Sequence, residues 1–139
     1  MRLKFDPEWC TGCQACVMAC LDQRDVRPAV GQSPLCRLEA VEETGRLSFA
    51  FVTCIQCGRC AAVCPTGCLT LTPQGIIAVE ESLCVGCRQC EELCPHGVIS
   101  WEADSGYVKK CDVCLGRVMA GLPPACVHTC PTGALRWEE

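Results

Sequence analysis

Residues 54–65 read CIQCGRCAAVCP, with four cysteines separated by two, two and three residues. The same spacing returns in residues 84–95, CVGCRQCEELCP, and in residues 10–20, CTGCQACVMAC. A fourth set in residues 111–130 is stretched, because eleven residues separate its second and third cysteines. Sixteen of the 18 cysteines belong to these four sets. Thiolates repeated at a fixed short spacing are typical metal ligands, so the sequence predicts a chain folded around four metal centres.

The cysteine content limits what else can stabilise the chain. Its 139 residues suffice for one compact domain, but the hydrophobic fraction of 50% includes all 18 cysteines. If the cysteines bind metal, few apolar residues remain to form a hydrophobic core. The chain then needs the metal for stability, because the free energy of metal binding contributes to the free energy of folding. Residues 1–9 contain no apolar signal segment and no run of about 18 apolar residues follows, so we expect a cytoplasmic chain without a direct membrane span. A reducing cytoplasm disfavours disulfides, which also do not require the repeated spacing.

Charge and motifs exclude several classes of function. The formal net charge is −4, and nucleic-acid binding is excluded because it depends on neutralising phosphates with Lys and Arg. The sequence contains no Gly-rich dinucleotide fingerprint and no nucleophile paired with a histidine. We therefore expect no catalytic residues in this chain.

Three of the sets close with a Cys-Pro step that starts a short repeat. The repeats are CPTGCLTL at 64–71, CPHGVISW at 94–101 and CPTGALRW at 130–137. Each combines a proline, a glycine and alternating apolar residues, which predicts a turn followed by a short strand. We expect the fourth cysteine of each set to begin a short helix.

Local patterns predict a few more short elements. Residues 35–41 and 46–52 flank Glu43-Thr44-Gly45 and indicate a β-hairpin. Further strands are expected at residues 76–79 and 100–108, the latter broken at 104–106. Helices are expected at residues 61–64, 89–94 and 115–120, with Pro123 and Pro124 ending the last one.

The CxxCxxCxxxCP run resembles that of bacterial ferredoxins, in which the fourth cysteine of one run ligates the cluster of the other. The resemblance implies four [4Fe-4S] clusters with crossed ligand sets. These sets are Cys54, Cys57, Cys60 with Cys94; Cys84, Cys87, Cys90 with Cys64; Cys10, Cys13, Cys16 with Cys130; and Cys111, Cys114, Cys126 with Cys20. The implied fold is α+β, built from short strands and short helices around the clusters. A ferredoxin-like two-cluster unit of residues 51–108 is inserted in an outer two-cluster unit of residues 1–50 and 109–139.

A wider resemblance rests on residues 110–114, KCDVC, on the eleven-residue gap, and on residues 124–134, PACVHTCPTGA. With the order of the four sets, they resemble the iron-sulfur electron-transfer subunits of molybdenum and tungsten oxidoreductases. That family includes subunits of dimethyl sulfoxide reductase, formate dehydrogenase and tungsten aldehyde oxidoreductase, and related hydrogenase subunits. The resemblance implies a non-catalytic subunit of anaerobic metabolism that relays electrons between a catalytic subunit and a flavin subunit or ferredoxin.

Two departures from the family pattern are visible. Cys20 is followed by Leu21 instead of proline, which is common at the first set of this family. The sequence stops two residues after Trp137, without the extension or membrane helix of membrane-bound relatives, so a soluble complex is expected. Some members replace one ligand and carry a [3Fe-4S] cluster, whereas all sixteen ligand positions here are cysteine.

Other interpretations remain open at this stage. A freely diffusing polyferredoxin is the main alternative, and a maturation or scaffold protein with structural clusters is a third. Zinc is the competing metal, although four-cysteine zinc sites use two pairs instead of a triplet and a Cys-Pro. If clusters reach both ends of an elongated body, head-to-tail stacking of subunits into a filament is a further hypothesis.

Five residues near the sets have two interpretations each. Cys68 and Cys36 are expected to be buried inert thiols, and the alternative is an extra ligand or a redox switch. His96 occupies a turn position, and the alternative is proton coupling. Lys109 and Lys110 either offset local cluster charge or dock an acidic partner, and the alternative is an ordinary solvated pair.

Overall fold

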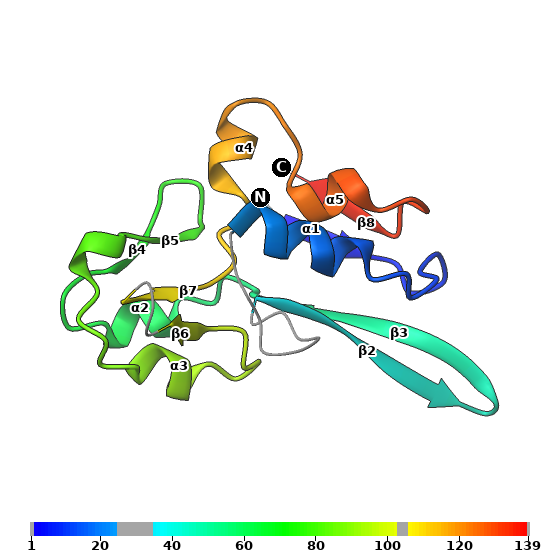
Figure 1. The fold of residues 1–139 in the computed structure, drawn as a ribbon, viewed down its shortest axis with the longest axis horizontal. Coiled ribbons are helices and arrows are strands. Elements are labelled where there is room, and N and C mark those ends of the chain that lie inside the picture. Colours follow the sequence, from blue (N-terminus) through cyan, green and yellow to red (C-terminus); the bar gives the residue numbers. More distant parts are fainter. Residues whose placement is uncertain (1, 25–34, 103–105, 139) are drawn as a thin grey trace.

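A computed structural model describes residues 2–24, 35–102 and 106–138 (Figure 1). Its strands form two-stranded antiparallel sheets and its helices are short, so the expected α+β class is confirmed. The sheets pair β1 (Arg2–Phe5) with β8 (Leu135–Glu138), β2 (Cys36–Glu43) with β3 (Arg46–Thr53), β4 (Leu69–Leu71) with β5 (Ile77–Val79), and β6 (Ser100–Glu102) with β7 (Tyr107–Lys109). The helices are α1 (Ala15–Arg24), α2 (Arg59–Val63), the 3-10 helix η1 (Glu81–Leu83), α3 (Gln89–Leu93), α4 (Leu115–Met119) and α5 (Ala125–Thr129).

The two ends of the chain meet in one sheet. In the β1–β8 pair Leu3 lies opposite Trp137 and Phe5 opposite Leu135. Helices α1 and α5 pack on each other beside this sheet, as Figure 1 shows. The buried residues of this part are Cys16, Val17, Cys36, Cys126 and Leu135. Segments from the first 40 and the last 15 residues therefore share one core.

A second core belongs to the middle of the chain. Helix α2 packs on α3, and the sheets β4–β5 and β6–β7 lie beside this helix pair (Figure 1). The buried residues of this core are Cys60, Cys68, Leu69, Ile77, Cys90, Ile99 and Val108. The two helices begin alike, since Gly58 and Arg88 both cap them in the left-handed conformation.

The fourth cysteine of a set ends a helix, so the prediction that it begins one is wrong. Cys64, Cys94 and Cys130 follow the last residues of α2, α3 and α5, and their ψ angles are 117°, 118° and 113°. Proline disfavours the helical region for the residue before it, so each helix stops there. Cys20 has no proline after it and lies inside α1, which continues to Arg24.

Most other elements fall where the sequence places them. The hairpin β2–β3 turns at Thr44 and Gly45, close to the expected strand boundaries. The structure also contains the strands expected at residues 76–79 and at both ends of 100–108, although 103–105 lie outside the described residues. Strand β1 and helices α1 and α5 are not predicted by the sequence patterns. The expected unit boundary at residues 50 and 51 falls within β3.

The hairpin covers the loop of the first cysteine set. In Figure 1 the base of the hairpin lies beside α1, and its tip extends away from the rest of the structure. Gly12 has a φ of +73°, and a Cβ built on it would overlap the Phe49 ring. Phe51 lies 5.9 Å from Phe5 between ring centroids, which attaches the same strand to β1. The loop can approach the hairpin this closely because residue 12 has no side chain.

Substitution of Gly12 tests this contact. Gly45 has a similar φ of +76° but nothing within 4 Å of its Cβ position, so Gly45→Ala is the matched control. We expect Gly45→Ala to cost about 1 to 2 kcal/mol for the left-handed conformation, and Gly12→Ala to cost more because the Phe49 ring must also move. Thermal unfolding of the purified proteins measures both. A Phe49→Ala background should remove the excess, and equal costs for the two alanines would contradict the packing.

Candidate metal centres

Three hollows in the structure are each lined by four cysteines of one crossed set. The Cys54 hollow is lined by Cys54, Cys57, Cys60 and Cys94; the Cys84 hollow by Cys84, Cys87, Cys90 and Cys64; and the Cys111 hollow by Cys111, Cys114, Cys126 and Cys20. Their empty volumes, including the part open to solvent, are about 330, 350 and 370 Å³. In each hollow the fourth cysteine comes from a different motif than the other three.

The first set is drawn together less completely. Cys16 is close enough to Cys10 and Cys130 for their charges to raise its pKa. Cys16 and Cys130 also pack in the same apolar cluster. Cys13 lies exposed in the loop between Cys10 and Cys16. Three of the four expected residues are therefore neighbours, and the fourth is in the connecting loop.

The loops hold the first cysteine of a set with a backbone hydrogen bond. The sulfur atoms of Cys10, Cys54 and Cys111 accept bonds from the N–H groups of residues 12, 56 and 113, with N to Sγ distances of 3.4, 3.3 and 3.4 Å. Gln56 and Val113 adopt positive φ angles of 59° and 53°, which turn the loop back over the sulfur. Such bonds favour the thiolate, the form that binds a metal.

The cysteines before proline differ electrostatically from the buried ones. Burial raises the pKa of Cys16 and of Cys90 to about 11. Burial also acts on Cys64, but hydrogen bonds from the backbone of Leu69 and Thr66 and from the Thr66 side chain outweigh it and lower its pKa to about 7. The pKa of Cys130 is lowered in the same way, against burial, by Leu135 and Thr132. The Cys-Pro turns at Cys64 and Cys130 thus each supply a thiol that loses its proton more easily.

Trp101 closes one side of the Cys84 hollow. Its indole lies 3.3 Å from the position that a Cβ on Gly86 would take, next to the ligand loop. Glu91 accepts a hydrogen bond from the Trp101 backbone N–H at 2.9 Å and pairs with Arg88 at 2.8 Å. The Arg88 guanidinium lies 5.5 Å from the centre of the Trp101 ring. These contacts fix the orientation of the indole.

The Trp101 indole also tests whether the hollow fits an iron-sulfur cluster. Its Nε1 is buried and has no hydrogen-bond partner within the described residues. A buried donor without an acceptor is costly, and the sulfur atoms of a cluster or of its thiolates would supply one. Within residues 2–24, 35–102 and 106–138, no group of three or more His, Cys, Asp or Glu side chains is arranged so that it could hold a single metal ion. The all-thiol donor set, the hollow and the unsatisfied donor fit a [4Fe-4S] cluster.

The two additional cysteines lie beside ligand sets. Cys68 is 2% exposed and lines the Cys84 hollow, and Cys36 is 3% exposed and lines the Cys111 hollow. Burial and then the nearby Cys84 raise the pKa of Cys68 to about 12. Both cysteines are buried, as expected.

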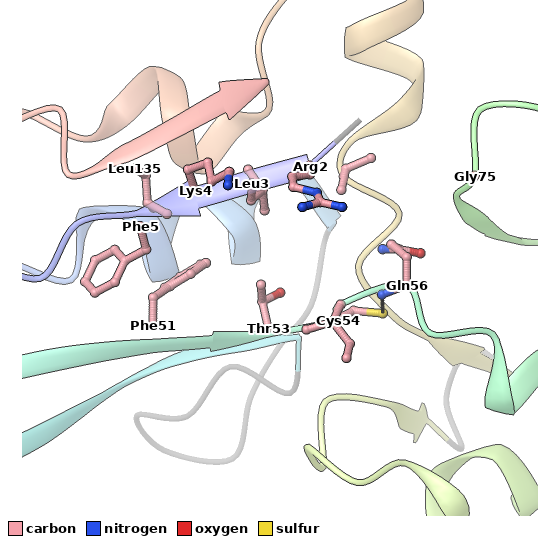
Figure 2. A pocket seen from close by; sticks show the side chains of 12 residues that line it. Arg2, Leu3, Lys4, Phe5, Phe51, Thr53, Cys54, Gln56, Gly75 and Leu135 are labelled. Atoms are coloured by element: carbon pink, nitrogen blue, oxygen red, sulfur yellow. Dashed lines mark hydrogen bonds between the residues drawn. The ribbon is translucent and has the colours of Figure 1, made fainter. Parts of the chain in front are cut away.

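A further cavity, of about 500 Å³, separates β1 from the loop after β3 (Figure 2). Arg2 and Lys4 line one side, and Phe5 and Phe51 face each other at one end. Its described lining residues include no carboxylate and no histidine. His96, the residue considered for proton coupling, contributes its backbone carbonyl to a bond from Arg37 at 3.0 Å. Among the described residues, no carboxylate or imidazole is therefore placed to move protons in this cavity.

No helix within the described residues is long and apolar enough to span a bilayer.

Comparison with known proteins gives a consistent result. Two family models described as 4Fe-4S dicluster domain match residues 9–69 and 45–139. A subunit of the anaerobic dimethyl sulfoxide reductase of Haemophilus influenzae is 35% identical over 94% of this chain and 70% of its own length. The thiosulfate reductase electron transfer subunit PhsB of Salmonella typhi is 36% identical over 95% and 72%. The formate dehydrogenase-O iron-sulfur subunit of Escherichia coli is 31% identical over 96% of this chain but only 51% of that subunit.

Replacing Trp101 by phenylalanine tests the unsatisfied N–H. The substitution retains an aromatic ring and removes the donor, so a protein with bound clusters should lose about 0.5 to 1.5 kcal/mol of stability. Anaerobic denaturant unfolding of the iron-loaded protein measures this. Trp9 is 60% exposed, and Trp9→Phe serves as the control with little expected effect. A loaded Trp101→Phe protein as stable as the parent would show that the donor finds no partner on the bound group.

Proposed function

Because the chain belongs to the 4Fe-4S dicluster family of iron-sulfur subunits, we propose that it relays electrons for a separate catalytic subunit and catalyses no reaction itself. A dicluster domain holds two clusters, so two such domains imply four [4Fe-4S] clusters. When bound, these clusters supply one-electron oxidation and reduction. Two of the relatives described above are electron-transfer or iron-sulfur subunits by name, which supports the same role here.

We assign the sixteen cysteines of the four crossed sets as the ligands. The observation that carries this assignment is the lining of three hollows, each by all four members of one set. The assignment divides the chain into an inserted unit of residues 51–108 and an outer unit of residues 1–50 and 109–139. The two separate cores and the β1–β8 pairing support a division of this kind, although β3 continues across residues 50 and 51 and its Phe51 packs in the outer core.

The four sets follow each other in a line. Cys90 of one set and Cys60 of the next are close enough for their charges to interact. Cys54 of that second set and Cys111 of the third interact in the same way. Cys126 of the third set and Cys16 of the first set complete the series. The proposed path therefore runs from the Cys84 hollow through the Cys54 and Cys111 hollows to the Cys10 set.

The proposed partner is the catalytic subunit of a molybdenum or tungsten pterin oxidoreductase, such as a formate dehydrogenase or aldehyde oxidoreductase, or of a hydrogenase. A flavin subunit or a ferredoxin exchanges electrons at the other end. Several large apolar side chains are more than 60% exposed and are available for contact with a partner: Met18, Ile55, Leu71, Val85 and Met119. Reduced thiols are required as ligands, so we assign the chain to a reducing cytoplasm.

Cysteine substitution tests the ligand assignment. We expect about sixteen iron and sixteen sulfide per anaerobically prepared chain, since each cluster contains four of each. Cys64→Ala should lose about a quarter of the iron, because one cluster loses a ligand. The matched control is Cys68→Ala, at the other cysteine of the same turn and in the same hollow, which should retain all of it. Stoichiometric zinc, or equal iron loss in both variants, would contradict the assignment.

Anaerobic affinity purification from native extract separates the functional alternatives. Recovery of a stoichiometric catalytic subunit is the expected outcome, whereas recovery of the chain alone favours a freely diffusing polyferredoxin. Light scattering of the purified complex over a range of concentrations addresses self-stacking. Particles of one small size at all concentrations would count against filaments.

A further inference from the structure

Among the described residues, Lys110 is the charged residue that is buried, with 2% of its surface exposed. It follows β7 and directly precedes Cys111. Its neighbour Lys109 is only partly buried and extends over the Tyr107 ring, 5.6 Å from the ring centre. The interpretation of both residues as a solvated pair is therefore wrong for Lys110.

Neutral oxygen atoms surround the Lys110 ammonium group. Its Nζ donates to the carbonyl of Cys111 at 2.7 Å, to the carbonyl of Ile77 at 2.8 Å, and to the Gln56 side-chain Oε1 at 3.1 Å. An ammonium has three N–H donors, and three oxygen atoms lie within hydrogen-bonding distance of this one. No carboxylate is among these partners. A buried charge without an opposite charge nearby is costly, so a negative partner is missing from this arrangement.

Gln56 connects the Lys110 ammonium group to other segments of the chain. Its Oε1 also accepts the backbone N–H of Ile77 at 2.9 Å, and its Nε2 donates to the Cys111 carbonyl at 2.8 Å. Residues from three distant segments of the chain are thereby joined at one point. Figure 2 shows Gln56 next to Cys54, in the loop that belongs to the Cys54 hollow.

Cysteines of two different sets lie next to this network. Lys110 directly precedes Cys111, and its Nζ donates to the Cys111 carbonyl at 2.7 Å. Gln56 accepts from Lys110 through its side chain, and its own backbone N–H donates to the Cys54 Sγ at 3.3 Å. The ammonium therefore lies between the Cys54 set and the Cys111 set.

We propose that Lys110 is a shared buried counter-ion for the clusters of the Cys54 and Cys111 hollows, and that it raises the reduction potentials of both. The proposal rests on the ligand sets of the proposed function. Reduction adds one electron to a group that is already negative, and a fixed cation nearby stabilises the added charge. Gln56 is a positioning residue, because its hydrogen bonds hold the ammonium between the loops of the two hollows. The Cys54 and Cys111 hollows are the two middle sites of the proposed electron path. The same lysine thus raises the reduction potential at both.

The test is a redox titration of the anaerobically purified, iron-loaded protein, followed by electron paramagnetic resonance. Lys110→Met retains a long unbranched side chain and removes the charge. We expect two of the four couples to shift to lower potential, by at least tenfold in the ratio of reduced to oxidised cluster, about 59 mV for a one-electron couple. The other two couples should stay in place. Four unchanged couples would overturn the proposal.

Lys109→Met is the matched control, because it removes the same charge one residue away at a partly exposed site. Any shift that it causes should disappear in about 1 M salt, where the Debye length is about 3 Å. The shift caused by Lys110→Met should persist in salt because the group is buried. Equal, salt-sensitive shifts in both variants would show a general surface effect and overturn the proposal.

A second variant covers the case in which Lys110→Met does not fold. Gln56→Glu retains Lys110 and places a carboxylate at the atom that now accepts its hydrogen bond. Because this neutralises the ammonium, the same two couples should shift downward, and unchanged couples would overturn the proposal. A parent protein without four clusters would instead refute the proposed function, so the two failures are distinguishable.

Discussion

A residue that precedes proline is disfavoured in the helical region, and in this chain that residue is a cysteine of the proposed ligand sets three times. The short helices α2, α3 and α5 stop at Cys64, Cys94 and Cys130 for this reason. The chain then turns so that backbone N–H groups of the following residues point at the sulfur of Cys64 and Cys130. One local steric constraint therefore ends all three helices, and at Cys64 and Cys130 the turn that follows also lowers the pKa of the thiol. Where the proline is missing, after Cys20, the helix continues instead.

The sequence predicts the parts of the fold that depend on local chemistry. Turn residues at Thr44 and Gly45 determine the hairpin, and each Cys-Pro-x-Gly turn is followed by a strand as expected. Helix α1 is not predicted, because ligand spacing of the first set indicates a loop, although Leu21 in place of proline is a signal for its continuation. Strand β1 is not predicted because it is four residues long and its partner lies at the opposite end of the chain.

Side-chain networks that cross the two cores cannot be predicted from local patterns. Gln56 gives no motif signal, and its bond to Cys111 spans 55 positions. The same holds for the bond of Arg37 to His96, which spans 59 positions and joins the hairpin to a turn of the middle of the chain. The cysteine spacing predicts which thiols lie close together. It does not predict that the Lys110 charge lies between two of the sets, because that placement depends on long-range packing. A lysine next to a ligand is visible in the sequence, but its burial is not.

The pairing of β1 with β8 also has a consequence for biosynthesis. The residues of the middle core, from Cys60 to Val108, are all synthesised before the last strand exists. None of these residues belongs to β1 or β8, so the middle core can form without either end of the chain. The N-terminal strand must wait for residues 135–138 to be translated. The core around β1 and β8 can therefore be completed only after nearly all of the chain has been synthesised.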